Sequence, residues 1–158
     1  MPARSSGNRE VDIAVEALRK DIDQQFRETE NSIGVVFGAL DTGTGTNDRY
    51  MLPFSPRVAT SASEVYFPVY RAGVLSPFMV RIDSIGAAAA TRRIEIVLRV
   101  NGKDTPMRVH FSCPLFTGIL RATQKVKVEK NDLLSVAIRK SAILVTACDL
   151  GPLFMELS

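Results

Sequence analysis

Tryptophan is absent from this sequence, tyrosine occurs three times, and there is a single histidine among 158 residues. One imidazole argues against a metal centre built from several histidines, and it leaves His110 as the only base for a Ser-His-Asp or Cys-His arrangement. No serine lies in a G-x-S-x-G turn, and no phosphate-binding glycine loop or dinucleotide fingerprint is present. We therefore expect a protein that is not an enzyme and that holds no cofactor and no metal ion.

Long apolar runs and a surplus of charge of one sign are also missing. Residues 1–12 lack the apolar centre of a secretory signal peptide, and the most apolar late stretch, 133–148, is interrupted by Arg139 and Lys140. We expect no signal peptide and no membrane insertion. The formal net charge is +3, and the Lys and Arg residues are scattered along strand-like runs, as on a solvated sheet face. Nucleic-acid binding is not expected, because it needs a basic stripe with interleaved aromatic residues.

Cysteine is scarce as well. The two cysteines, Cys113 and Cys148, each lie in or beside an apolar, strand-like run. Buried thiols without a disulfide are the simplest interpretation. A disulfide between the two remains open, since the sequence gives no Cα separation.

What the sequence does contain is alternation. In residues 98–111, LRVNGKDTPMRVHF, apolar and charged residues alternate on both sides of a polar island, Asn101 to Asp104. A period of two is typical of strands with one face in a core, and Asn-Gly suits a tight turn because both residues accept positive φ. A β-hairpin is predicted. It places His110 on the face opposite the apolar residues of its strand, toward solvent or a neighbouring subunit.

Similar short runs follow one another from residue 49 to the C-terminus, with turn signals between them. The expected strands cover residues 49–54, 58–62, 64–71, 76–85, 92–100, 106–113, 124–128, 133–140, 142–147 and 153–157. Short strands at close spacing without intervening helices predict an antiparallel sandwich or barrel over residues 49–158. The aromatic residues expected in its core or at a subunit interface, or alternatively in a binding groove, are Tyr66, Phe67, Tyr70, Phe78, Phe111, Phe116 and Phe154.

The N-terminal quarter has a different pattern. Residues 1–8 are small and polar and are expected to be disordered, whereas residues 9–40 predict a helix because apolar residues recur at steps of three and four. Residues 41–48, DTGTGTND, predict a flexible linker. The apolar stripe must be buried, and we favour self-association in a short bundle over packing on a partner. The residues expected to make this contact are Ile13, Leu18, Ile22, Phe26, Ile33, Val36 and Phe37.

Several turns of the C-terminal region resemble those of a known superfamily. AGVLSPFMVRIDS (72–84), the loop IGAAAA, RRIEIVLRVNGKDTPMRVHF (92–111), QKVKVEKNDLLSVAIRK (124–140) and the closing PLFMELS are similar to the jelly-roll head of the complement and tumour-necrosis-factor-like superfamily. The versions in bacteriophage virion proteins and bacterial surface fibres are most similar. Asn131 stands where these commonly have glycine, and asparagine also tolerates a left-handed backbone. Over residues 65–158 the resemblance implies an antiparallel jelly roll that forms three-fold trimers behind a helical or fibrous stalk.

The resemblance and the N-terminal stripe lead to a functional expectation. We expect a non-enzymatic phage virion protein, made in the host cytoplasm. It would be a homotrimeric capsid decoration or cement protein, attached to capsid or tail proteins through its N-terminal segment. A decoration protein is favoured over a long fibre because the sequence contains no extended shaft. The alternative is a receptor- or glycan-binding head of a tail or surface fibre, which would bind a host-surface glycan through the turns at 84–91 and 114–122.

Overall fold

The computed structural model describes residues 15–20, 32–39, 42, 45–54, 60–84, 92–113, 117–141 and 148–158, without the side chains of residues 84, 92 and 113. The chain divides into two units, Met1–Ile33 and Gly34–Ser158. In the first unit a helix covers residues 15–20, where Val15 and Leu18 are exposed and Glu16 pairs with Lys20. No helix among the described residues is long and apolar enough to cross a membrane.

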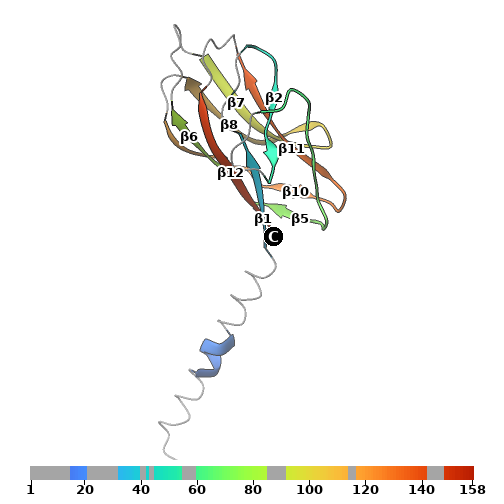
Figure 1. Cartoon of the computed structure of the whole chain (residues 1–158). Helices are drawn as coiled ribbons and strands as arrows, with labels where there is room; N and C mark the ends of the chain where they lie inside the picture. The colour runs from blue at the N-terminus through green and yellow to red at the C-terminus, as the bar shows by residue number, and fades with distance from the viewer. Residues whose placement is uncertain are drawn as a thin grey trace, which may run out of the picture. The chain divides into compact units, whose positions relative to one another are not determined.

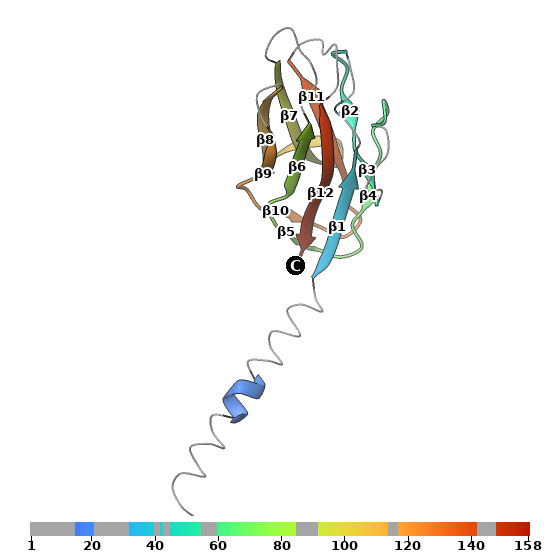
Figure 2. The ribbon, with the colours of Figure 1, turned by 60° about the vertical axis from the view of Figure 1, so that its left-hand side comes forward.

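The second unit is a sandwich of two sheets, which Figure 1 shows with most of its strands labelled. The larger sheet contains seven of the described strands: β1 (Ile33–Gly38), β3 (Leu52–Pro53), β5 (Gly73–Leu75), β6 (Met79–Ser84), β9 (Gly118–Arg121), β10 (Val126–Val128) and β12 (Asp149–Leu157). Strand β12 is central, because it is flanked by β1 on one side and by β6 and β5 on the other. Strand β9 extends the sheet beyond β6, and β10 extends it beyond β5 (Figure 2).

The smaller sheet contains five described strands: β2 (Arg49–Tyr50), β4 (Phe67–Pro68), β7 (Arg92–Val100), β8 (Lys103–Cys113) and β11 (Leu133–Lys140). Strand β11 pairs with β7 along its length and with the short strands β2 and β4 on its other side, while β8 pairs with β7. Every strand pair with a defined register is antiparallel. The expected fold class is therefore confirmed: a mainly β, antiparallel jelly-roll sandwich with a short helix in the N-terminal segment.

One hydrophobic core fills the space between the sheets, since alternate residues of each strand point inward. The largest fully buried side chains are Phe37, Phe78, Met51, Leu75, Ile82, Ile94, Ile96, Leu98, Met107, Leu134 and Ile138. Burial of each such side chain contributes roughly 1.5–3 kcal/mol. The intervening residues point outward, and packing of the core does not determine which residue types stand on the outer face of each sheet.

The predicted hairpin connects β7 to β8. Asn101 and Gly102 form its turn with φ values of 52° and 74°, so the polar island is shorter than expected and Asp104 already belongs to β8. The left-handed backbone expected at Asn131 is also confirmed, with φ 74°. Strands β7 and β11 have the predicted bounds, because long alternating runs specify both the strand and its inward face.

The helix predicted for residues 9–40 is wrong at its C-terminal end, where β1 occupies residues 33–38. Val35 and Phe37 are fully buried on one face of this strand, and β-branched residues beside two glycines favour a strand over a helix. The sandwich consequently begins before residue 49. The predictions for residues 1–14 and 21–31 lie outside the described residues.

The flexible linker predicted for residues 41–48 is wrong at Thr42, which is fully buried. Its backbone N–H donates to the Cys148 carbonyl oxygen (2.9 Å), and its hydroxyl accepts from the Cys148 N–H (3.0 Å). Cys148 is disulfide-bonded, so the expectation of a thiol is wrong for this residue. The side chain of Cys113 and the strand expected at residues 142–147 lie outside the described residues.

Candidate functional site

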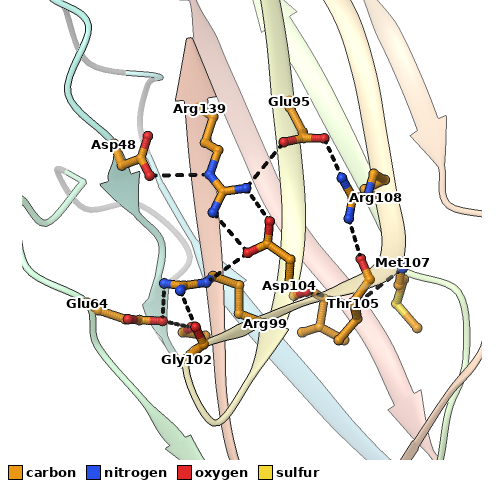
Figure 3. A network of polar contacts seen from close by, with 12 residues as sticks. Asp48, Glu64, Glu95, Arg99, Gly102, Asp104, Thr105, Met107, Arg108 and Arg139 are labelled. Atoms are coloured by element: carbon orange, nitrogen blue, oxygen red, sulfur yellow. Dashed lines mark hydrogen bonds and ion pairs between the residues drawn. The ribbon is translucent and has the colours of Figure 1, made fainter.

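Charged side chains gather on the outer face of the five-stranded sheet, where Figure 3 shows them. The register places them there: Glu95 in β7 is opposite Arg139 in β11 and opposite His110 in β8. Residues two apart on a strand share a face, so Arg99 joins Glu95. We call the connected set the arginine–carboxylate network; its members are Asp48, Glu64, Glu95, Arg99, Asp104, Arg108 and Arg139.

Asp104 is the centre of this network. The two terminal nitrogens of Arg139 donate to its two carboxylate oxygens, one of them at 2.9 Å, and Arg99 Nε donates to Oδ1 at 3.1 Å. The hydrogen bonds from Arg139 hold the pKa of Asp104 below its usual value, with partial burial opposing that effect. The same hydrogen bonds raise the pKa of Arg139, which also donates to Asp48 (3.3 Å). Both groups are therefore charged at any pH near neutrality.

Glu64 fastens the segment before β4 to the sheet. Its carboxylate lies 2.7 Å from Arg99 Nη1 and accepts a hydrogen bond from the Ser135 hydroxyl. The hydrogen bond between Glu64 and Tyr66 raises the pKa of the tyrosine. Val97 and Ala137 point outward on this sheet and are nevertheless fully buried. The side chains of the network, with the segments that contain Asp48 and Glu64, thus cover the outer face of the sheet at Val97 and Ala137.

A bulge in β8 positions two members of the network. Between the Val97↔Arg108 and Arg99↔Asp104 pairs, β8 has two more residues than β7. The Thr105 hydroxyl stabilises this irregularity, because it donates to the Leu98 carbonyl oxygen (2.8 Å) and accepts from the Met107 N–H (3.2 Å). Two extra residues preserve the alternation, so Asp104 and Arg108 both remain on the outer face.

A hollow of about 220 Å³ opens where β7 and β11 meet. It is lined by Arg93, Glu95, His110, Arg139, Lys140 and Ser141. Glu95 is shared among three cationic or imidazole groups: Arg108 Nη1 at 3.1 Å, Arg139 Nη1 at 3.6 Å and His110 Nε2 at 3.6 Å. Among the described residues no group of three or more His, Cys, Asp or Glu is arranged to hold a metal ion.

The outer face of the seven-stranded sheet has a different composition. Four strands of this face each carry an outward apolar residue, and we call these residues, Val36, Met79, Ile119 and Phe154, the apolar band. Ile119 is 62% exposed and lies opposite Arg81. Phe154 lies opposite Met79 in the strand register. The Phe154 ring lies close to Gly34, because a Cβ atom added to Gly34 would be only 3.1 Å from that ring. A hollow of about 360 Å³ beside the band is lined by Ser76, Pro77, Met79, Arg121, Ala122, Phe154 and Glu156.

A third surface feature is an aromatic cluster at the edge of the sandwich. The Phe67 ring packs edge-to-face against Phe54 and Tyr70, with centroids 5.0 Å and 6.3 Å apart. Phe54 and Tyr70 are 68% and 71% exposed, while Phe67 is buried. Phe54 also has a φ of 61°, which is unusual for a bulky side chain. The buried Phe67 ring thus supports two solvent-exposed rings, those of Phe54 and Tyr70.

The seven residues predicted to make intermolecular contacts do not form one helical stripe. Leu18 is 63% exposed on the helix, and Ile33 is 42% exposed at the start of β1. Val36 and Phe37 point to opposite faces of β1, so Phe37 lies in the core and Val36 on the outer face. Ile13, Ile22 and Phe26 lie outside the described residues. A contact role for these residues remains a prediction.

The predicted aromatic core is confirmed in part. Phe67, Phe78 and Phe111 are buried, whereas Tyr66, Tyr70 and Phe154 are 40%, 71% and 37% exposed. The predictions for Phe116 and for the loop 85–91 lie outside the described residues. Strand β9 occupies residues 118–121, within the turn expected at 114–122.

No family model matches the chain, and no curated protein matches it. Among solved structures the chain is similar to the native structure of a family 35 carbohydrate-binding module from Clostridium thermocellum, with 12% sequence identity and a TM-score of 0.41. The match covers 80% of this chain and 92% of that one.

Proposed function

We propose that the protein is a non-enzymatic structural protein of a bacteriophage particle, made in the host cytoplasm. In this proposal it is a homotrimeric capsid decoration or cement protein, attached to capsid or tail proteins through its N-terminal segment. The observation that carries the proposal is the apolar band on the outer face of the seven-stranded sheet. The resemblance of residues 65–158 to trimeric jelly-roll heads supports both the phage setting and the trimer.

The band has the composition of a subunit contact. Contiguous exposed apolar residues with a polar rim mark protein–protein interfaces. Charged groups of both signs stand at this rim: Arg121 and Glu156 line the same hollow, and neither has an ion-pair partner among the described residues. Because this patch carries charges of both signs, the Arg121 of one copy can pair with the Glu156 of another copy. A second copy of this chain is therefore the occupant that we infer for the band.

The N-terminal helix supports the attachment half of the proposal. Val15 and Leu18 are 46% and 63% exposed, three residues apart on one face of the helix. A short helix with an uncovered apolar stripe is stabilised by packing on another surface. Three such segments in one trimer raise the avidity for a particle lattice without a tight individual contact.

The experiment that tests the proposal is the native mass of the purified full chain by light scattering, together with two variants. Ile119→Glu places a charge in the apolar band, whereas Thr123→Glu adds the same charge at an exposed position outside it. We expect a trimer for the unchanged chain and for Thr123→Glu, and a monomer for Ile119→Glu. A monomeric unchanged chain contradicts the proposal.

A chain that begins at residue 32 separates the two halves of the proposal. All described strands lie within residues 33–158, so this chain retains the sandwich. A trimer shows that the sandwich associates by itself and that the N-terminal segment is available for the particle. A monomer instead assigns the association to the N-terminal segment.

A glycan-binding head is the second candidate function, and the aromatic cluster is the observation that favours it. Exposed rings held by an edge-to-face contact suit stacking on the apolar face of a sugar ring. Phe54→Ala and Tyr70→Ala are expected to abolish binding to immobilised host-surface glycans, whereas Phe154→Ala, in β12 and outside the cluster, leaves binding unchanged. Equal binding by all three variants contradicts a glycan site at the cluster.

A further inference from the structure

The hollow of about 220 Å³ between β7 and β11 combines a defined geometry with an excess of hydrogen-bond donors. Two cross-strand rows build it. The first row is His110, Glu95 and Arg139, each opposite the next. The second row lies two residues earlier in β7 and contains Arg93, whose side chain shares the outer face with Glu95.

Arg93 and Ser141 both line the hollow, and two hydrogen bonds join them. The Ser141 N–H donates to the Arg93 carbonyl oxygen (3.0 Å), and the Arg93 N–H donates to the Ser141 hydroxyl oxygen (3.1 Å). The hydroxyl accepts in this contact, so its own proton remains for a further acceptor. The Arg93 guanidinium has no ion-pair partner among the described residues.

The charge balance of the hollow favours an anion. Among the described residues that line the hollow, Glu95 is the only carboxylate, and it already contacts Arg108, Arg139 and His110. Arg139 is in turn compensated by Asp104 and Asp48. Lys140 also lines the hollow, and its ammonium donates to the Thr42 carbonyl oxygen (3.1 Å). No described carboxylate lies within ion-pair distance of Arg93, which lines the hollow together with His110 and Ser141.

We propose that this hollow, with Arg93, His110 and Ser141 as its direct donors, binds a single tetrahedral oxyanion, for which sulfate is the probe. A guanidinium fork matches the oxygens of such a group bidentately, and an imidazole and a hydroxyl supply further donors. The volume is several times the roughly 30 Å³ of a water molecule and below the roughly 300–1,000 Å³ of sites for drug-sized ligands. A single charged group fits the hollow, whether it is free sulfate or the substituent of a sulfated sugar.

The test is calorimetric titration of the full-length protein with inorganic sulfate, glucose 6-sulfate and glucose at constant ionic strength. Arg93→Gln is expected to weaken binding of both sulfated probes at least about tenfold, because it removes a charge-assisted contact. Lys125→Gln removes one positive charge at an exposed position that lines neither hollow, and we expect it to change the affinity less than about twofold. Tighter binding of glucose 6-sulfate than of sulfate identifies a sulfated sugar as the source, and equal binding identifies the free ion.

His110 gives a second readout that does not depend on a variant. It is the only histidine in the sequence, so its imidazole proton signals in an NMR spectrum need no assignment. Saturable shifts of these signals with sulfate support the site. The proposal is overturned if neither sulfated probe binds, if glucose binds as well as glucose 6-sulfate, or if Arg93→Gln binds like the unchanged protein.

Discussion

On the outer face of the five-stranded sheet, Arg99 and Arg139 each contact more than one carboxylate, whereas on the outer face of the seven-stranded sheet Ile119 is 62% exposed. Arg121, beside Ile119 on β9, has no ion-pair partner among the described residues. Both faces are antiparallel strands with alternating side chains, so their secondary structure does not distinguish them. The difference lies in whether the outward residues bind one another.

This difference separates stability from association. Ion pairs that form a network within one chain lock the side chains of several strands together, and they have little left to offer a partner. Exposed apolar residues add little to the folding of the single chain, yet they gain free energy as soon as another surface covers them. The charged face should therefore control unfolding, and the apolar face should control assembly.

The largest effect is expected from Asp104→Asn. The substitution removes the charge at the centre of the network and leaves Arg99 and Arg139 with fewer partners, at an expected cost of about 2 kcal/mol in the free energy of unfolding. The matched control is Asp83→Asn, which breaks a pair with an Arg81 side chain that is 69% exposed, and it should cost less than about 0.5 kcal/mol. Urea denaturation measures both. If both substitutions lower the free energy of unfolding equally, the charged face does not contribute more to stability than the other face.

Acid should weaken the charged face in a predictable direction. The pKa of Asp104 is lowered from 3.8, chiefly by hydrogen bonds from Arg139, so its stabilising effect is fully present above that value. It is lost as the pH falls through the depressed pKa of the folded state. The difference in unfolding free energy between the unchanged protein and Asp104→Asn should thus be constant near neutrality and shrink below about pH 4. If the difference in unfolding free energy instead grows as the pH falls, the pKa of Asp104 is not lowered by folding and the prediction is wrong.

A smaller effect is expected from Thr105→Val, which keeps the shape of the side chain and removes its hydroxyl. The Met107 N–H then loses its acceptor and the Leu98 carbonyl oxygen loses a donor, at a cost of about 1 kcal/mol. The bulge also orients Asp104 and Arg108. A double-mutant cycle with Asp104→Asn should accordingly give a coupling energy clearly different from zero, and strict additivity would show that the bulge does not support the network.

The sequence allowed much of the fold to be predicted where two signals coincided. The hairpin at Asn101 and Gly102 was marked both by alternation and by turn chemistry, and its position is confirmed. Strand β1 was mistaken for part of a helix because its apolar residues continued the spacing of the segment before it. Phe37 pairs with Pro53 of β3 across the sheet, and such a long-range contact leaves no mark in a local pattern.

The outer faces could be predicted only in part. Alternation correctly placed His110 on an exposed face, and it indicated that Arg139 points outward. It did not show that Arg139 meets Asp104, because these residues lie 35 positions apart and come together only through the register of β11 and β7. The apolar band was missed for the same reason: it unites single residues from four strands, and each of them alone is an ordinary exposed apolar residue.

The smallest effect on stability is expected on the apolar band, from Ile119→Thr. The side chain is 62% exposed, so its replacement should change the free energy of unfolding of the single chain by less than about 0.5 kcal/mol. Val97→Thr is the matched control, because Val97 also points outward but is fully buried beneath the network. The substitution would bury the threonine hydroxyl, at a cost of about 1–2 kcal/mol in the free energy of unfolding. If the proposed trimer forms, native mass should respond in the opposite order, with Ile119→Thr weakening the trimer and Val97→Thr leaving it intact. If Val97→Thr dissociates the trimer while Ile119→Thr does not, the charged face contains the subunit contact and the roles of the two faces must be exchanged.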